Sequence, residues 1–241
     1  MPLLALANLS KTYGALVVTD NLSLEVGNHE ILGILGPNGA GKTTLFNLIT
    51  GTVRPETGTV HFNGEDITKL SASDRCRKGI SRSFQIPNPF SGMTVFENVL
   101  VGATFGRTKQ TNDPRQRAAE VLELTGLRHK ANRLAGSLTL LERKRLEMAR
   151  ALATDPKLLL LDEIAGGLTD PECQSLLAAI RDVHASGVSI VWIEHVVHAL
   201  LSVAQRLVVV NFGRTIAEGL PAVVMANLEV QSVYMGDADH V

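Results

Sequence analysis

A glycine-rich run at residues 36–44 has the residue types and the spacing of a phosphate-binding loop. It reads Gly36-Pro37-Asn38-Gly39-Ala40-Gly41-Lys42-Thr43-Thr44 and fits the pattern G-x-x-x-x-G-K-[ST]. An apolar stretch precedes the run and an apolar helical pattern follows it, which argues against a simple glycine-rich turn. Successive N–H groups of such a loop face phosphate oxygens, and the following helix adds the positive end of its dipole. We expect Lys42 to bind the β- and γ-phosphates and the Thr43 hydroxyl to bind Mg²⁺.

Two adjacent carboxylates follow a second apolar stretch further along the chain. Asp162 and Glu163 come directly after Leu158 to Leu161. Asp162 suits a metal ligand, and Glu163 suits a base that polarises an attacking water. Adjacent acidic residues after a strand are common, so the pair indicates a catalytic site only in combination with the phosphate loop upstream. Together the two motifs predict a nucleoside triphosphatase.

The elements that must position these motifs are short apolar runs. Several runs are continuous rather than alternating, as expected of parallel strands buried on both faces. We predict strands at Leu3 to Ala7, Leu22 to Val26, Ile31 to Leu35, Thr59 to Phe62, Lys157 to Leu161, Val188 to Ile193 and Arg206 to Val210.

Helical patterns lie between these runs. They cover Thr43 to Thr50, a segment opened by Asp113-Pro114, Leu140 to Ala153, and a segment opened by Asp170-Pro171. Alternating strands and helices in the first and last thirds predict an α/β fold with a doubly wound, mostly parallel sheet. We assign residues 1–86 and 156–241 to this nucleotide-binding core. Residues 87–155 carry helix signals and are expected to form an inserted helical subdomain.

Composition excludes several classes of protein. Lys plus Arg is 23 and Asp plus Glu is 24, so no global basic field favours nucleic acid. The two cysteines, Cys76 and Cys173, are far apart and fit no disulfide framework or zinc site. Apolar runs are broken by charge before they reach the roughly 18 residues of a membrane-spanning helix. We expect a chain of the cytoplasm that is neither secreted nor membrane-spanning.

Residues beyond the two motifs make the chain resemble the ATP-binding cassette (ABC) ATPases along its whole length. Tyr13, in Ser10-Lys11-Thr12-Tyr13-Gly14, is similar to the aromatic residue that stacks on adenine in that family. Gln85 resembles the glutamine that contacts metal and water. His195, after the apolar run ending at Ile193, resembles the switch histidine that contacts the γ-phosphate. The resemblance implies a P-loop fold with an antiparallel β edge, ATP and Mg²⁺ as cofactors, and ATP hydrolysis.

The family's Leu-Ser-Gly-Gly-Gln signature is altered in this chain. Its position reads Leu138-Thr139-Leu140-Leu141-Glu142. Thr139 keeps the hydroxyl and is expected to contact a partner's ATP, and Thr139-x-x-Glu142 also forms a capping box. The two leucines and the charge of Glu142 are expected to weaken that contact. Ile164 replaces a proline of the family, and Asp170 is expected to cap the next helix.

The tail places the chain nearer one subfamily. Residues 211–219 and 233–236, with residues 93–99, resemble ATPases that energise bacterial uptake of branched-chain and other hydrophobic amino acids. The resemblance implies membrane-embedded permease subunits as partners, a second ATPase subunit in a homodimer or heterodimer, and a solute-binding protein acting indirectly. It places the chain on the inner face of the bacterial plasma membrane, held there by protein partners.

Other functions stay open at this point. A regulatory nucleotide-binding subunit with little turnover would fit the altered signature. A soluble cassette ATPase of repair or translation is disfavoured, since the chain has no coiled-coil insertion and no basic patch. A P-loop kinase would lack Gln85 and His195. We expect the permease to dock just after Gln85, at residues 86–97.

Overall fold

The computed structural model describes residues 1–106 and 113–235. These residues form two compact units. Unit 1 comprises residues 1–72 and the described residues from 191 onward, and unit 2 comprises residues 73–190. The domain boundaries expected from the sequence, 1–86 with 156–241 and 87–155, remain a prediction.

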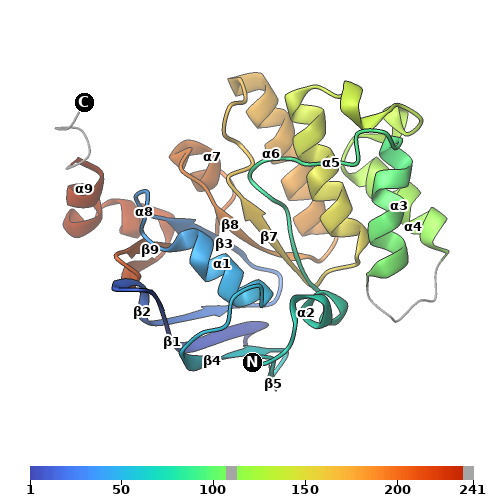
Figure 1. The fold of residues 1–241 in the computed structure, drawn as a ribbon. Coiled ribbons are helices and arrows are strands. Elements are labelled where there is room, and N and C mark those ends of the chain that lie inside the picture. The colour runs from blue at the N-terminus through green and yellow to red at the C-terminus, as the bar shows by residue number, and fades with distance from the viewer. Residues whose placement is uncertain (107–112, 236–241) are drawn as a thin grey trace. The chain divides into compact units, whose positions relative to one another are not determined.

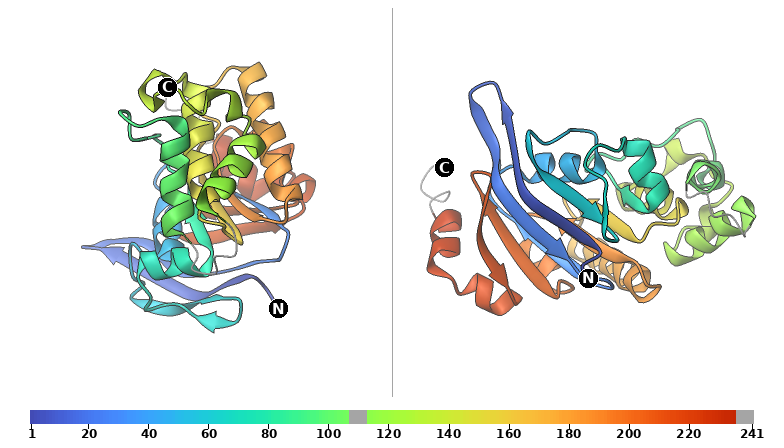
Figure 2. Two further views of the ribbon diagram at one scale, coloured as in Figure 1. Left: turned by 90° about the vertical axis from the view of Figure 1, so that its right-hand side faces the viewer. Right: turned by 90° about the horizontal axis from the view of Figure 1, so that it is seen from below.

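An antiparallel sheet forms the first part of unit 1. Its strand order is β2-β1-β4-β5, and the strands are β1 (Leu4–Tyr13), β2 (Leu16–Val26), β4 (Thr57–Phe62) and β5 (Glu65–Asp66). Alternate residues of β1 and β2 face the core, and Leu6 pairs with Leu24. Figure 2 shows β1 and β2 as a long hairpin in dark blue. The hairpin is longer than the two strands predicted for it, Leu3 to Ala7 and Leu22 to Val26. Its outer half, near Tyr13, is exposed and therefore has no buried apolar pattern that the sequence could reveal.

A second sheet of unit 1 carries the phosphate loop. Its order is β10-β9-β3-β8 in this unit; β3 pairs with β9 in parallel and β10 with β9 antiparallel. The strands are β3 (Ile31–Leu35), β8 (Ser189–Ile193), β9 (Arg206–Asn211) and β10 (Arg214–Gly219). All five residues of β3 are buried, as its continuous apolar run predicts. The helices are α1 (Lys42–Thr50), α7 (Val197–Leu201), α8 (Pro221–Met225) and α9 (Leu228–Met235).

Unit 2 combines two parallel strands with a group of helices. Strand β6 (Ile80–Arg82) pairs with β7 (Leu158–Asp162), and the Ser189 N–H at the start of β8 donates to Lys157 O. Helices α3, α4 and α5 pack against one another, and α6 packs against α5 (Figure 1). The helices are α2 (Ala72–Lys78), α3 (Val95–Phe105), α4 (Pro114–Leu124), α5 (Leu140–Ala153) and α6 (Asp170–Ala185), with 3₁₀ turns at Arg128–Lys130 and Ala135–Ser137.

The start of α6 differs from the prediction. Thr169 is the N-cap residue and Asp170 is already the first residue of the helix. The Glu172 carboxylate accepts hydrogen bonds from the Thr169 N–H and hydroxyl, at 2.9 and 2.8 Å. The expectation that Asp170 caps this helix is therefore wrong, because Thr169 and Glu172 form the capping box instead. Gly236, used above for the subfamily resemblance, lies outside the described residues.

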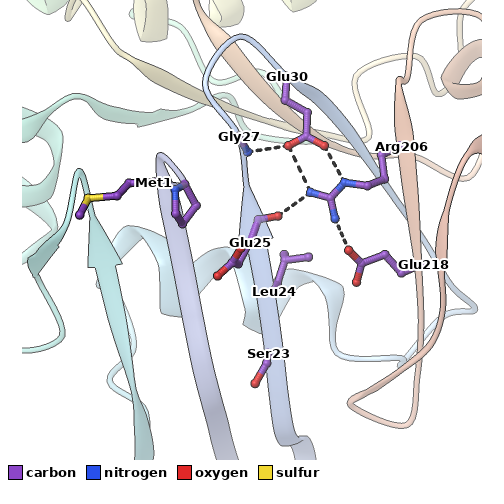
Figure 3. Close-up of a pocket in the computed structure, with 9 residues that line it drawn as sticks. Met1, Ser23, Leu24, Glu25, Gly27, Glu30, Arg206 and Glu218 are labelled. Carbon is purple, nitrogen blue, oxygen red and sulfur yellow. Dashed lines mark hydrogen bonds and ion pairs between the residues drawn. The ribbon is translucent and has the colours of Figure 1, made fainter.

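A salt-bridge network around Arg206 ties the two sheets of unit 1 together. Arg206, at the start of β9, donates to Glu30 Oε1 at 2.7 Å, to Glu25 O at 2.6 Å and to Glu218 (Figure 3). The network lies in a hollow of 530 Å³ that contains none of the predicted site residues. None of the helices in the described part of the chain is long and apolar enough to cross a membrane.

Candidate functional site

The phosphate loop has a backbone that requires glycine at two positions. Gly36 follows β3, and a Cβ there would lie 2.2 Å from Val210 O of β9. Gly41 has φ +100°, and a Cβ there would lie 2.4 Å from Val18 O of β2. The Gly213 N–H, in the turn between β9 and β10, donates to Ala40 O at 3.0 Å. Strands β2 and β9 thus hold the loop on both sides, and the glycines allow them to approach.

Lys42 brings its charge to the same loop. It is the first residue of α1 and only 7% exposed, and its Nζ donates to Gly36 O at 2.6 Å and Pro37 O at 2.8 Å. Thr43, Asn38 and Gly39 are exposed, whereas Thr44 is half-buried. The ammonium and the positive end of the helix dipole therefore act at one place, which suits a phosphate.

Two further predicted residues belong to unit 1. Tyr13 lies at the end of β1, next to the hairpin turn, and is 48% exposed. His195 follows β8, and its side chain is 57% exposed. Its backbone N–H donates to Oε1 of the fully buried Glu194 at 3.1 Å, and its Nδ1 lies 3.5 Å from the same atom. The sequence analysis did not single out Glu194, which fixes the turn that presents His195.

Gln85 and Glu163, far apart in sequence, meet in unit 2. Gln85 Nε2 donates to Glu163 Oε2 at 2.5 Å, and Lys144 Nζ lies 3.5 Å from Glu163 O. Glu163 has φ +45°, a left-handed conformation that is uncommon for a residue with a side chain. Such backbone outliers cluster at functional sites. Glu163 shares this conformation with other residues of the chain, but it combines it with the hydrogen bond to Gln85, and its role as the base stays a prediction.

Asp162 has a partner that the sequence analysis missed. Its carboxylate lies 2.5 Å from the Arg82 guanidinium, and both side chains are nearly buried. Arg82 ends β6, a strand of three residues that is too short to show a periodic pattern. Arg82 also lies over the Phe84 ring, 5.2 Å from its centroid. The strand β6 thus places a cation against the predicted metal ligand.

The predicted magnesium ligands have suitable chemistry. They are the hydroxyl of Thr43, the amide oxygen of Gln85 and the carboxylate of Asp162, all hard oxygen donors of the kind that Mg²⁺ prefers. Gln85 uses its Nε2 to bind Glu163, so the amide oxygen is the atom of this side chain that would bind a metal. Mg²⁺ usually takes few protein ligands and completes its shell with water and substrate phosphates.

The altered signature caps helix α5 as predicted. Thr139 is the N-cap residue, and the Glu142 carboxylate accepts from the Thr139 N–H at 2.9 Å. Glu142 also pairs with Lys130 at 3.0 Å. Burial opposes the ionisation of Glu142, but the Thr139 N–H and the Lys130 ammonium together hold its pKa below the usual range. The charge of Glu142 is thus largely compensated by Thr139 and Lys130. Leu140 and Leu141 are therefore the main difference from the glycine signature.

We expect Thr139→Ala to lower the free energy of unfolding by about 1 kcal/mol, because an N-cap hydroxyl is lost. Thr139→Ser keeps the hydroxyl and should retain most of the stability. Urea denaturation of the three proteins measures the difference. Equal stability of the alanine and serine variants would show that the hydroxyl contributes nothing to the cap.

The predicted residues therefore belong to two groups. Tyr13, the phosphate loop and His195 lie in unit 1, and Gln85, Thr139, Asp162 and Glu163 lie in unit 2.

Comparisons with known proteins agree on one class. Residues 19–166 match the family described as ABC transporter. The chain is 37% identical to the high-affinity branched-chain amino acid transport ATP-binding protein LivG of Escherichia coli (strain K12), over 98% of this chain and 99% of that protein. It is 36% identical to the lipopolysaccharide export system ATP-binding protein LptB of Haemophilus influenzae, over 98% of both.

Solved structures give the same result. The ADP conformation of MJ1267, an ATP-binding cassette of an ABC transporter, matches with a TM-score of 0.88 and 31% identity, over 98% of this chain and 99% of that one. A nucleotide-free ATP-binding cassette from an ABC transporter also matches with a TM-score of 0.88, at 30% identity.

Proposed function

Because this chain belongs to the ABC transporter family and is an ATPase subunit of a transporter, we propose that it powers the uptake of branched-chain or other hydrophobic amino acids. The observation that carries this proposal is the 37% identity to LivG over nearly the whole of both chains. The proposal is also supported by the segments that carry the subfamily resemblance, residues 93–99, 211–219 and 233–236.

Export of a lipid is the second candidate. LptB is 36% identical to this chain, which is as close as LivG. The ATPase itself touches no solute, so its site fits either cargo. The two proposals share the ATP chemistry and differ only in the membrane partners.

We assign the following roles in ATP chemistry to the predicted residues. Tyr13 stacks on adenine, the phosphate loop and Lys42 bind the phosphates, and Glu163 orients the attacking water. His195 contacts the γ-phosphate, and Gln85, which donates to Glu163, contacts the attacking water. Thr43, Gln85 and Asp162 would supply oxygen ligands to Mg²⁺, which when bound would neutralise charge on the phosphates. The hydrogen bond between Gln85 and Glu163 supports this assignment, because it places the two groups together.

Residues 86–97 are proposed as the docking segment for a membrane-embedded permease. Ile86 is 78% exposed and Phe90 is 47% exposed, although both are apolar. The buried Asn98 supports the loop, since its amide accepts from the Phe90 N–H at 2.9 Å and donates to Phe90 O at 3.1 Å. Arg150 of α5 lies over the Phe90 ring. An apolar surface on a supported loop suits a protein partner at the inner face of the membrane.

A second ATPase subunit completes the proposed assembly. The family's site uses the phosphate loop of one subunit and the signature helix of the other. Leu140 is 44% exposed at the start of α5, where the signature has glycine, and its side chain limits close approach of the partner's ATP. We expect low turnover by this chain alone and higher turnover with a subunit that carries the glycine signature.

The test is co-purification with the membrane partners, followed by ATPase measurement in liposomes. We expect turnover to be low for the chain alone and to rise several-fold when leucine and its solute-binding protein are added to the complex. Stimulation by lipopolysaccharide instead of leucine would favour the second candidate. High turnover by the isolated chain would show that the leucines do not impair the site.

A further inference from the structure

Glu56 is the centre of a hydrogen-bond network that reaches the end of β1. It lies one residue before β4, and its N–H donates to Ser10 O at 2.9 Å. Its Oε1 accepts from Lys11 Nζ at 3.1 Å, from the Thr12 N–H at 3.2 Å and from the Thr12 hydroxyl at 2.9 Å. One carboxylate thus holds two consecutive residues of β1 by both main chain and side chains.

These two residues come directly before Tyr13. Lys11 Nζ lies over the Tyr13 ring, 5.4 Å from its centroid, within the range of a cation–π contact. The ammonium therefore lies against one face of the ring, and the exposure of Tyr13, at 48%, leaves room for a flat ligand to stack on the ring. The Lys11 side chain is only 19% exposed, so Glu56 and the strand restrict its motion.

The hairpin tip beyond this point is exposed, although its strands stay paired there, with Thr12 opposite Val17 and Tyr13 opposite Leu16. Tyr13, Leu16 and Val17 are all exposed, at 48%, 65% and 49%. The ladder orders the backbone of the tip, but an exposed side chain that is free to rotate must be ordered when a ligand binds, and that ordering weakens binding. A network that restrains Lys11 and Thr12 beforehand removes part of this entropic cost of binding.

The ionisation state of Glu56 fits its role in the network. The Thr12 hydroxyl, the Lys11 ammonium and the Thr12 N–H hold the pKa of Glu56 below its usual range. The carboxylate is therefore charged at neutral pH and accepts all of these hydrogen bonds.

We propose that Glu56 is a positioning residue for the adenine base: through Lys11 and Thr12 it fixes the Tyr13 ring with one face turned to the nucleotide. This inference rests on the proposed function, because it takes Tyr13 as the residue that stacks on adenine. Glu56 itself touches neither the base nor the phosphates. Its loss should therefore weaken binding of the base and leave phosphate binding unchanged.

The experiment measures the dissociation constants of the full chain for two probes, ATP and inorganic tripolyphosphate. We expect Glu56→Ala to raise the Kd for ATP about 3- to 10-fold, which corresponds to the cost of ordering one or two side chains. The Kd for tripolyphosphate, which has no base, should stay within about 2-fold of wild type because the phosphate loop is intact. Glu56→Gln keeps the shape of the side chain and should have a smaller effect.

Two further variants make the result specific. Glu25→Ala removes an exposed carboxylate from β2 of the same sheet, outside this network, and should change neither Kd. The double variant Tyr13→Ala with Glu56→Ala should bind ATP no more weakly than Tyr13→Ala alone, because Glu56 acts through the ring.

The outcomes separate the inference from the function on which it rests. Equal weakening of ATP and tripolyphosphate binding by Glu56→Ala would overturn the inference, as would additive losses in the double variant. If Tyr13→Ala left ATP binding unchanged, the assignment of Tyr13 itself would be wrong. If Tyr13→Ala weakened ATP binding and Glu56→Ala did not, only the role of Glu56 would be lost.

Discussion

Replacing Glu163 by glutamine is expected to stop ATP turnover while ATP binding remains intact. The amide keeps the size of the carboxylate but loses its basicity, and a general base typically contributes about 10²- to 10⁴-fold to a rate. Glu163 follows β7 with φ +45° and accepts a hydrogen bond from Gln85. Because glutamine has the same size as glutamate, the substitution should move little of the surrounding structure. Single-turnover hydrolysis and equilibrium ATP binding measure the two effects separately.

Lys42→Ala is the matched control for this variant. The Lys42 ammonium lies in the phosphate loop, so its loss should weaken ATP binding itself. Near-normal turnover in Glu163→Gln would contradict the assignment of Glu163 as the base. Loss of ATP binding in Glu163→Gln would show that Glu163 also contributes to the binding of ATP before hydrolysis.

Arg82→Ala is expected to lower the free energy of unfolding by about 3–5 kcal/mol. The change would leave the Asp162 carboxylate buried without its cation, and breaking a buried ion pair costs about this much. The Arg82 and Asp162 side chains are only 8% and 6% exposed, so water cannot replace the lost partner. Denaturant unfolding of the isolated protein gives the value.

Arg77→Ala provides the control in the same unit. Arg77 pairs with Asp74 at 2.6 Å, a similar distance, but the two side chains are 44% and 43% exposed. Exposed ion pairs contribute about 0–1 kcal/mol, so this variant should be nearly neutral. Similar losses in the two variants would mean that burial does not decide the strength of the Arg82 pair.

Long apolar patterns in the sequence predicted the elements that carry the motifs. Strand β3 and helix α5 have the bounds that the sequence predicts, because a buried strand and an amphipathic helix with a capping box each leave a clear pattern. Strands β5, β6 and β10 were missed, and β5 has only two residues. β6 has three residues, and β10 is an edge strand with mixed polar and apolar residues, so neither shows a period.

The contacts within the site were less predictable than its residues. The sequence indicated Asp162 and Glu163 by their position after a strand, and Gln85 by its resemblance to the glutamine of the family. It gave no sign that Arg82 pairs with Asp162 or that Lys130 pairs with Glu142, since these pairs depend on which strands and helices pack together. The roles of the site residues stay predictions until the variants are measured.

The pairing of β3 with β9 has a consequence for synthesis of the chain on the ribosome. The Arg206–Glu30 bond joins residues 176 positions apart, and β3 pairs with the same late segment. Translation adds roughly 5–20 residues per second, so strand β9 is completed about 10–35 s after β3. During that time its four apolar side chains have no strand β9 beside them, although β1, β2 and β4 can already form their own sheet. Slower translation of the last third would prolong this exposure and increase aggregation of the nascent chain.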